Sequence, residues 1–329
     1  MKIKLLAFLV LCGIFLCSCG DFIVAVDKNE KLPVESSAET SRNVTEIVQD
    51  TEKVPVHTEL QTEQPMPVPD EPDPSVFASV EELLLNPPVE GAKIAFLYED
   101  LTTGISWSYN ADEVMYSASV MKLPYALSLL YMDDMKDMGL DSIYTFTGNE
   151  DLSGTGEIRN MKPGTTFTYI ELIDYLLKYS DNVASGALFR KYDRDVYYDY
   201  VRSIGADNFT KDWGFAMSAE DCRRVLRSAW GYLEGNYKYS SRIKKVMIES
   251  QHKVMLPPGL GGKPIARKYG WDKEAYHDIG IVYDEHPYTL VFMSDMESAD
   301  WTINGYISKV ARLADEIHTE LWESVEAIR

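Results

Sequence analysis

Strand-like runs stand at both ends of residues 76–329, and helix-like runs fill the sequence between them. The first group, "AKIAFLYEDL" and "ISWSYNA", is rich in β-forming residues and is separated by "TTG", which predicts a hairpin. The second group, "IARKYGW", "DIGIVYD" and "YTLVFMS", comes near the C-terminus. We therefore expect an α+β domain whose sheet joins the two ends of the chain.

Four other runs have apolar residues at the three-to-four spacing of an amphipathic helix. They are "SVMKLPYALSLLYMDDM", "TYIELIDYLLKY", "SAEDCRRVLRSAWGYL" and "TINGYISKVARLADEIHTELWESV". The first begins at Ser119, and Pro124 fits its early turn because proline is tolerated there. The second begins with Thr168, a residue type that caps helices. Residues 76–329 are therefore expected to form one folded domain.

Residues 1–18 have the pattern of a signal peptide. Lys2 and Lys4 precede an apolar run from Leu5 to Leu16, which is short for a transmembrane span. The run ends in "LCSC", which resembles a bacterial lipobox and implies cleavage before Cys19 and a diacylglyceryl thioether on its sulfur. The protein is then expected to be extracytoplasmic and held to the cell membrane by this lipid. The alternative is an ordinary signal peptide with incidental cysteines.

Residues 19–75 are expected to be a flexible tether between that lipid and the domain. The segment is poor in aromatic residues and rich in Glu, Thr, Ser, Val and Pro. Such a composition cannot bury enough apolar surface to offset the entropy of the chain. The proline-rich stretch "PMPVPDEPDP" should be stiffer and marks the boundary with the domain.

Composition and spacing argue against several kinds of partner. The net charge of −20 disfavours nucleic acid, because phosphate binding needs clustered Lys and Arg. After cleavage Cys222 is the only cysteine besides Cys19, so no intramolecular disulfide is expected. We expect no cofactor and no metal, since the histidines lack the spacing of metal ligands. These are His57, His252, His277, His286 and His318.

The stretch "YSASVMKLP" contains a pair that can do chemistry. In a helix that begins at Ser119, Lys122 shares a face with the serine and its amine can approach the hydroxyl. If burial and a second cation lower the pKa of the amine, Lys122 can take the proton of Ser119. The serine can then attack a carbonyl and form an acyl-enzyme. The alternative for this motif alone is a capping serine and a solvated lysine.

Two further motifs follow in order. "KYSDNVAS" contains Ser180, Asp181 and Asn182, and "IARKYGW" contains Lys268 followed by Tyr269 and Gly270. S-x-x-K, S-D-N and K-x-G in this order resemble the class A β-lactamase and penicillin-recognising serine hydrolase family. The resemblance covers nearly all of residues 76–329. It implies the β-lactamase/transpeptidase-like fold, with an antiparallel sheet from both chain ends, flanking helices and a helical subdomain.

The resemblance also implies roles for individual residues. Ser119 would be the acylated nucleophile and Lys122 its general base or part of its proton relay. Ser180 would pass a proton to the leaving nitrogen. The substrate would be a β-lactam, another small amide or a peptidoglycan peptide.

Four residues would bind that substrate. Asn182 would hydrogen-bond its amide side chain, and Lys268 would hold its carboxylate. Gly270 completes the third motif. The backbone N–H groups of Ser119 and Trp271 would form the oxyanion hole.

Two departures from the family pattern bear on function. Tyr269 stands where the third motif has Thr or Ser, whose hydroxyl binds the substrate carboxylate. Between Ser180 and Ser218 the chain has no Glu to activate a deacylating water, and Asp207 and Asp212 are the only acids where that loop should lie. We therefore expect an acyl-enzyme that turns over slowly. The alternatives are a penicillin-binding, D,D-peptidase-like enzyme and a non-catalytic surface lipoprotein that binds ligands with this fold.

Overall fold

The computed structural model describes residues 73–206, 215–296 and 300–326. The predicted signal peptide, Cys19 and nearly all of the predicted tether lie outside these residues, as do Asp207 and Asp212. Within the described ranges, no helix is both long and apolar enough to cross a bilayer.

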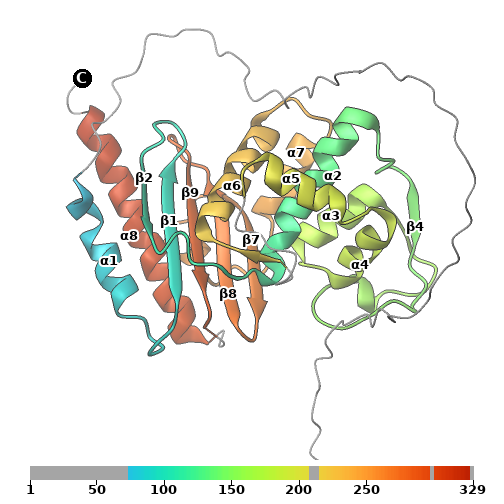
Figure 1. The fold of residues 1–329 in the computed structure, drawn as a ribbon, viewed down its shortest axis with the longest axis horizontal. Coiled ribbons are helices and arrows are strands. Elements are labelled where there is room, and N and C mark those ends of the chain that lie inside the picture. The colour runs from blue at the N-terminus through green and yellow to red at the C-terminus, as the bar shows by residue number, and fades with distance from the viewer. Residues whose placement is uncertain (1–72, 207–214, 297–299, 327–329) are drawn as a thin grey trace, which may run out of the picture. The chain divides into compact units, whose positions relative to one another are not determined.

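A single five-stranded antiparallel sheet forms the centre of the domain, and it combines both ends of the chain (Figure 1). The N-terminal hairpin lies at one edge, and its inner strand pairs with the last strand of the chain, where Ile94 stands opposite Ser294. The predicted topology is confirmed. In spatial order the strands are β2 (Ser106–Tyr109), β1 (Ile94–Asp100), β9 (Tyr288–Ser294), β8 (Ala275–Val282) and β7 (Ile265–Asp272).

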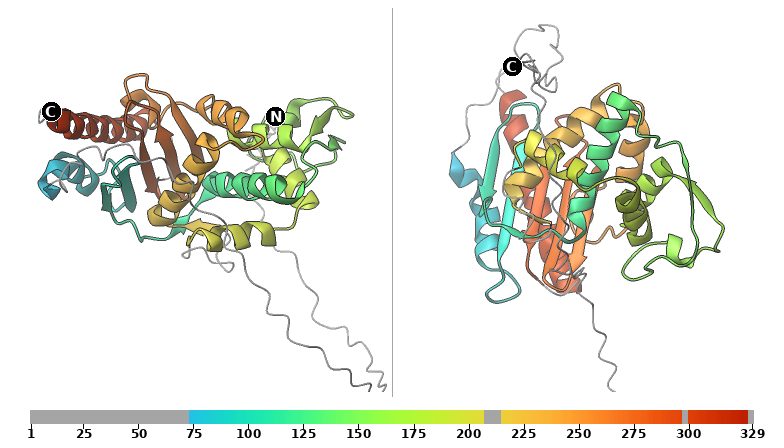
Figure 2. Two further views of the ribbon diagram at one scale, coloured as in Figure 1. Left: turned by 90° about the horizontal axis from the view of Figure 1, so that it is seen from above. Right: turned by 45° about the vertical axis from the view of Figure 1, so that its right-hand side comes forward.

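Both faces of the sheet are buried, which explains why its central strands are almost continuously apolar. Along β1, Ala95 and Leu97 join the larger hydrophobic core, whereas Phe96 and Tyr98 join the smaller one. Helices α1 (Ala78–Leu85) and α8 (Trp301–Glu326) cover the smaller core (Figure 2). The other face packs against the helical layer.

The helical layer is built from the middle of the chain. Its helices are α2 (Lys122–Lys136), α3 (Tyr169–Lys178), α4 (Asn182–Lys191), α5 (Asp195–Ser203), α6 (Ala219–Glu234) and α7 (Ser240–Ile248). Two small antiparallel ribbons join it: β3 (Met115–Tyr116) with β6 (Ala216–Met217), and β4 (Ile143–Thr145) with β5 (Thr166–Thr168). The four predicted helical runs all form helices, and α4, α5 and α7 complete the layer.

Two of the predicted helix starts can be compared directly. Thr168 caps α3 in a reciprocal capping box with Glu171, as expected. The start of α2 differs from the prediction, because residues Ala118–Met121 form a tight 3₁₀ turn, η2, and the α-helix begins only at Lys122. The N–H of Lys122 bonds to the carbonyl of Ser119, which keeps the two residues stacked one turn apart.

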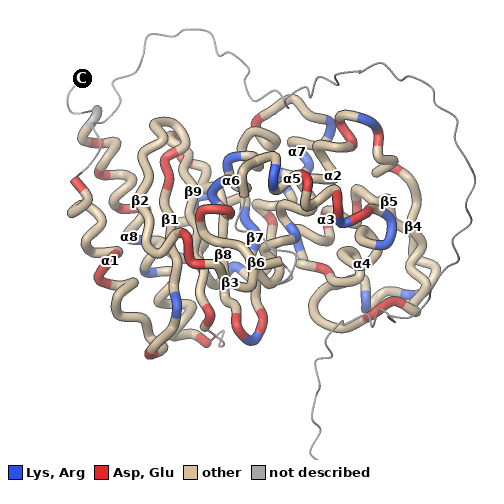
Figure 3. Tube along the Cα trace, in the orientation of Figure 1, with Lys and Arg blue, Asp and Glu red and all other residues tan. Residues whose placement is uncertain are grey.

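Charged residues of both signs lie along the helices and loops around the sheet (Figure 3). Several carboxylates are buried instead, and Glu99 on β1 is one of them. It accepts hydrogen bonds from Arg223 and Arg227 of α6. These contacts tie the helical layer to the sheet and satisfy a charge that would be costly to bury alone.

Candidate active site

The nucleophile turn is held in a conformation that ordinary residues avoid. Ala118, directly before Ser119, has a positive φ of 45°, and Phe215 has one of 54°. Left-handed backbone costs a residue with a side chain about 1–2 kcal/mol, so contacts must hold it. Ser117 supplies them, because both its N–H and its hydroxyl donate to the carbonyl of Phe215. Ser119 is thereby left half-buried at the start of the turn.

Gly270 lets strand β7 approach this turn closely. A Cβ at this position would lie 2.9 Å from the carbonyl oxygen of Ser117 and 3.1 Å from the backbone nitrogen of Val120. These are backbone atoms, which cannot swing away as a flexible side chain can. The glycine of the third motif therefore allows the nucleophile turn to pack closely against the sheet.

His277 anchors the strand that leads into the turn. It lies on β8 opposite Gly270, is fully buried, and accepts a hydrogen bond at Nδ1 from the N–H of Ser294. Its Nε2 therefore carries the proton and donates to the carbonyl of Tyr116 at 2.8 Å. Burial lowers its pKa to about 4, so the ring is neutral at neutral pH. His277 and Asp278 are neighbours on β8 and project to opposite sides of the strand.

Lys122 is buried and points at the second motif. Its Nζ donates to the carbonyl of Ser180 at 2.6 Å and to Oδ1 of Asn182 at 2.7 Å, and lies 3.3 Å from the Ser180 hydroxyl. Burial lowers the pKa of Lys122 to about 7, and the nearby Asp181 carboxylate opposes this shift. A neutral amine has two N–H groups for the two short bonds, and its lone pair then remains for a proton.

Ser180 connects this amine to a second buried lysine. Ser180 is 1% exposed and has a positive φ of 54°. The hydroxyl accepts a hydrogen bond from Nζ of Lys268 at 3.0 Å. Burial, Lys122 and Arg267 lower the pKa of Lys268 well below its ordinary value. The three motifs therefore meet in one hydrogen-bonded chain: Lys122, Ser180 and Lys268.

Asp181, the middle residue of the second motif, holds that motif in place. Its carboxylate caps α4 at the N–H of Ala184 and also accepts from the N–H groups of Glu157 and Ile158, at 2.7 and 2.9 Å. The preceding loop also holds the second motif, because the Thr155 hydroxyl donates to the carbonyl of Ser180. Asp181 thus positions Ser180 and Asn182 without entering the reactive chain itself.

Tyr269 fills the place where the family has Thr or Ser. Its side chain leaves β7 on the same face as Arg267, and its ring lies 4.9 Å from that of His252, tilted by 32°. Nζ of Lys268 lies 4.3 Å from the ring centre. Trp271, near the end of the strand, is 48% exposed and also stacks on His252. Aromatic rings therefore cover this side of the site.

A cavity of about 340 Å³ opens beside Tyr269. Its walls are the loop that contains Thr155, together with Tyr179, Gln251, His252 and Tyr269. Thr155 and Tyr269 each neighbour the Ser180–Lys268 pair, so the cavity adjoins the Ser180 end of the chain of buried groups. If Ser180 protonates the leaving group of the substrate, that group lies at this end of the site.

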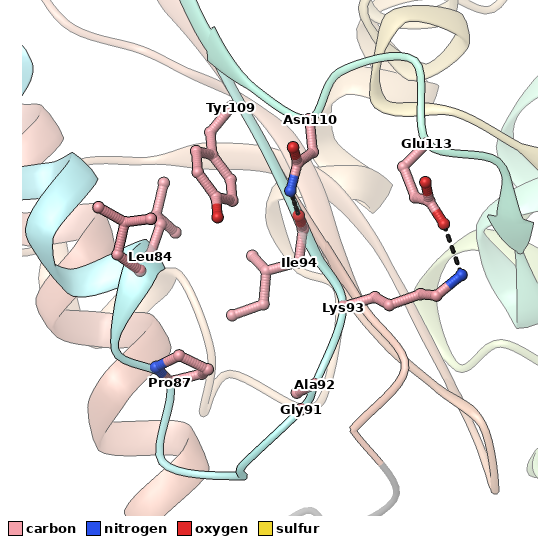
Figure 4. Close-up of a pocket in the computed structure, with 10 residues that line it drawn as sticks. Leu84, Pro87, Gly91, Ala92, Lys93, Ile94, Tyr109, Asn110 and Glu113 are labelled. Carbon is pink, nitrogen blue, oxygen red and sulfur yellow. Dashed lines mark hydrogen bonds and ion pairs between the residues drawn. The ribbon is translucent and has the colours of Figure 1, made fainter.

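A second cavity, of about 420 Å³, lies between the end of α1 and the start of β1 (Figure 4). Leu84, Ile94 and Tyr109 line it, and Lys93 pairs with Glu113 at its rim. Neither cavity is lined by Ser119, Lys122, Ser180 or Lys268. Of the two, the smaller one has lining residues, Thr155 and Tyr269, that bond to Ser180 and Lys268, so we assign the chemistry to its neighbourhood.

Within the described residues, the hydrogen bonds of the two buried amines reach no carboxylate. Lys122 bonds to Ser180 and Asn182, and Lys268 bonds to Ser180 and to the carbonyl of Tyr269. Asp207 and Asp212 lie outside the described residues.

The predicted site residues are brought together by the fold. Lys122, Ser180, Asn182 and Lys268 are linked by hydrogen bonds, Ser119 lies one turn before Lys122, and Gly270 packs against the same turn. Trp271 follows Gly270, with its side chain at the rim.

Sequence reasoning missed the supporting residues. These are Ser117, Thr155, Asp181, His252 and His277. Asp181 had a usable signal, since an aspartate before a helical run is a typical cap. The others act through contacts between distant segments, which no local pattern reveals.

The comparisons with known proteins agree with this arrangement. A model of the β-lactamase enzyme family matches residues 79–318. No curated protein matches the chain. The structure of PBP-A is 19% identical with a TM-score of 0.66, over 75% of this chain and 96% of that one. A β-lactamase from Sphaerobacter thermophilus is 15% identical with a TM-score of 0.68, over 74% and 97%. One from Chitinophaga pinensis is 22% identical with a TM-score of 0.65, over 74% and 99%.

The sheet made from both chain ends and the buried lysines around Ser180 define a serine hydrolase with the β-lactamase/transpeptidase-like fold. The family match spans most of the described residues, and the chain belongs to the β-lactamase enzyme family. The predicted fold and family are confirmed.

Replacing Gly270 by alanine should disturb the seating of the nucleophile turn. The new Cβ would press on backbone atoms of Ser117 and Val120, so we expect the free energy of unfolding to fall by about 1–3 kcal/mol. Urea denaturation measures this change. Gly305→Ala is the matched control, because its Cβ would meet open space within α8 and should raise the free energy of unfolding by about 0.5–1 kcal/mol. Equal effects of the two substitutions would contradict the proposed contact.

Proposed function

We propose that this protein is a lipid-anchored serine hydrolase that forms an acyl-enzyme at Ser119 with a β-lactam or a related amide and deacylates slowly. The observation that carries the proposal is the hydrogen-bonded chain of Lys122, Ser180 and Lys268 beside the Ser119 turn. A mutant of the structural neighbour PBP-A has been solved as an acyl-enzyme complex with penicillin G. That complex supports a β-lactam as the first ligand to test here.

In the proposed acylation, Lys122 is the general base. A base works best when its pKa lies near the working pH, and burial brings the pKa of Lys122 to about 7. The amine takes the proton of Ser119 while Oγ attacks the carbonyl carbon. The backbone N–H groups of Ser119 and Trp271 stabilise the oxyanion that develops on the carbonyl oxygen.

Collapse of this intermediate requires a proton at the leaving atom. The Ser180 hydroxyl lies 3.3 Å from Nζ of Lys122 and 3.0 Å from Nζ of Lys268. It passes its proton to the leaving nitrogen and is reprotonated from Lys122. Asn182 accepts from Lys122 at Oδ1 and donates from Nδ2 to the carbonyl of Ser153 at 3.3 Å. In the proposed complex its N–H₂ group turns from that carbonyl to the acyl side of the substrate.

Deacylation needs a water and a base on the far side of the ester. The buried amines have no carboxylate partner among the described hydrogen bonds, and the chain has no Glu between Ser180 and Ser218. A long-lived acyl-enzyme follows from this reading. The same features suit a penicillin-binding, D,D-peptidase-like enzyme acting on peptidoglycan peptides, which is the second candidate.

The proposal includes a membrane anchor outside the described residues. "LCSC" directly after an apolar run supports lipidation of Cys19, and the aromatic-poor segment after it supports a tether that holds the domain outside the cell membrane.

Ser119→Ala should abolish covalent labelling by a β-lactam without changing the fold. The substitution removes only the hydroxyl of a half-buried side chain. Intact-mass spectrometry of the purified protein with excess β-lactam follows the adduct over time, and circular dichroism checks the fold. A lasting adduct on the native protein supports slow deacylation, whereas one that vanishes as drug is consumed would indicate a β-lactamase with another means of water activation. An adduct that persists in Ser119→Ala would exclude Ser119 as the nucleophile.

The rate of acylation should depend on the protonation of Lys122. Below a pKa of about 7 the amine is protonated and cannot accept the Ser119 proton, so the rate constant should fall about tenfold per pH unit and level off above that pKa. Adduct formation measured between about pH 5.5 and 9 tests this profile. A flat profile through neutral pH, with the protein folded throughout, would rule out Lys122 as the titrating base.

Cys19→Ser should release the protein from the membrane fraction of the cell that produces it. The substitution removes the sulfur that would carry the lipid. Ultracentrifugation and immunoblotting measure the distribution, and Cys222→Ser is the control because that thiol is buried within the domain. Membrane retention of the Cys19→Ser protein would disprove the lipid anchor.

A further inference from the structure

Tyr269 changes the end of the site where the leaving group lies. The side chain is 7% exposed and its ring is held between His252 and the amine of Lys268, at 4.9 Å and 4.3 Å. Burial raises the pKa of the Tyr269 phenol, and Arg267 and the Ser180 hydroxyl oppose that rise. The ring therefore occupies space that a small Thr or Ser would leave to the substrate.

The amine closest to Tyr269 has no free direction for a substrate. Even when protonated it has only three N–H groups. Nζ of Lys268 donates to Ser180 at 3.0 Å and to the carbonyl of Tyr269 at 2.7 Å, and the face of the Tyr269 ring lies on a further side. A carboxylate could reach this amine only by displacing the ring.

The charge of Arg267, the neighbour of Lys268 on β7, is already neutralised. Arg267 is 1% exposed and bonds through Nη1 to both carboxylate oxygens of Asp278, at 2.8 Å each. Its Nη2 donates to the carbonyls of Gln251 and His252. This buried guanidinium supports the wall of the cavity and offers no unshared charge to a ligand.

The cavity itself carries no excess of positive charge. Its two charged lining residues, Glu157 and Arg159, have opposite signs and are exposed to solvent. His252 is half-buried, and burial together with Arg267 lowers its pKa, which favours the neutral ring. The remaining wall is formed by the rings of Tyr179 and Tyr269 and by polar loop residues. An uncharged or ring-bearing group fits the side of the cavity formed by Tyr269, where a carboxylate would face an aromatic ring instead of an unshared cation.

We propose that Tyr269 is a specificity-determining residue that excludes a free carboxylate from the leaving-group end, so that the preferred substrates are amides or esters with an uncharged leaving group. The inference rests on the proposed function. In the reaction the Ser119 oxygen bonds to the carbonyl carbon and the bond from that carbon to the leaving nitrogen or oxygen breaks. The proton lost by Ser119 returns to the leaving atom through Lys122 and Ser180.

Benzylpenicillin and its methyl ester differ only in the carboxylate and give a matched pair of probes. Rate constants for acylation of the purified chain are measured by intact mass for both compounds. We expect the ester to acylate the native protein about tenfold or more faster than the acid. In Tyr269→Thr the preference should fall by about tenfold or reverse, because a hydroxyl and an uncovered Lys268 become available to the carboxylate. Tyr269→Phe keeps the ring and should keep the preference for the ester.

The two proposals fail in different ways. An acid that reacts as fast as the ester with the native protein overturns this inference alone, and that measurement requires no variant to fold. An unchanged preference in Tyr269→Thr, with thermal unfolding like that of the native protein, also overturns it. Absence of any adduct with both compounds and with a fluorophosphonate, which labels activated serines generally, overturns the proposed function and this inference with it.

Discussion

Two lysine amines buried around one serine hydroxyl set the requirements that the rest of the structure meets. Burial of a charged amine is costly, and neither Lys122 nor Lys268 has a carboxylate hydrogen-bond partner among the described residues. The fold therefore offers them carbonyl and hydroxyl oxygens and lowers their pKa values. Those oxygens must be fixed, which explains the left-handed backbone of Ser180 and the several hydrogen bonds of Asp181 beneath it.

Much of this could be predicted from the sequence because the signals are local. The N-terminal hairpin, the three C-terminal strands and the capped helix after Thr168 follow from residue patterns, and three ordered motifs indicated the residues that meet. The start of α2 was misjudged by three residues, because the turn around Ser119 is a 3₁₀ turn packed against Gly270 of β7, a distant segment that local periodicity does not reveal. The small β3–β6 ribbon and the anchoring by His277 were also missed, since both join segments that are distant in sequence.

Tyr269 illustrates the limit most clearly. Its identity was visible as a departure from the family pattern, and alternation along a strand was enough to separate Arg267 from Lys268. Whether the ring turned away or filled the site depended on His252, a residue of positive φ in a loop before the strand. If the ring excludes a carboxylate, the protein is poorly suited to cleave a peptide bond before a C-terminal residue. That outcome weighs against a D,D-carboxypeptidase within the same family and fold.

The pairing of β1 with β9 also has a consequence for how the protein is made. A ribosome delivers Ile94 long before Ser294, its partner across the sheet. Until the last strands emerge, the inner strand of the hairpin presents an unpaired apolar edge, a typical starting point for aggregation. The helices of the middle of the chain can form first, but the site cannot, because Lys268 and Gly270 arrive with the C-terminal strands. A chain that stops before β7 therefore lacks a complete site, and its uncovered β1 edge is where we expect association with other chains to begin.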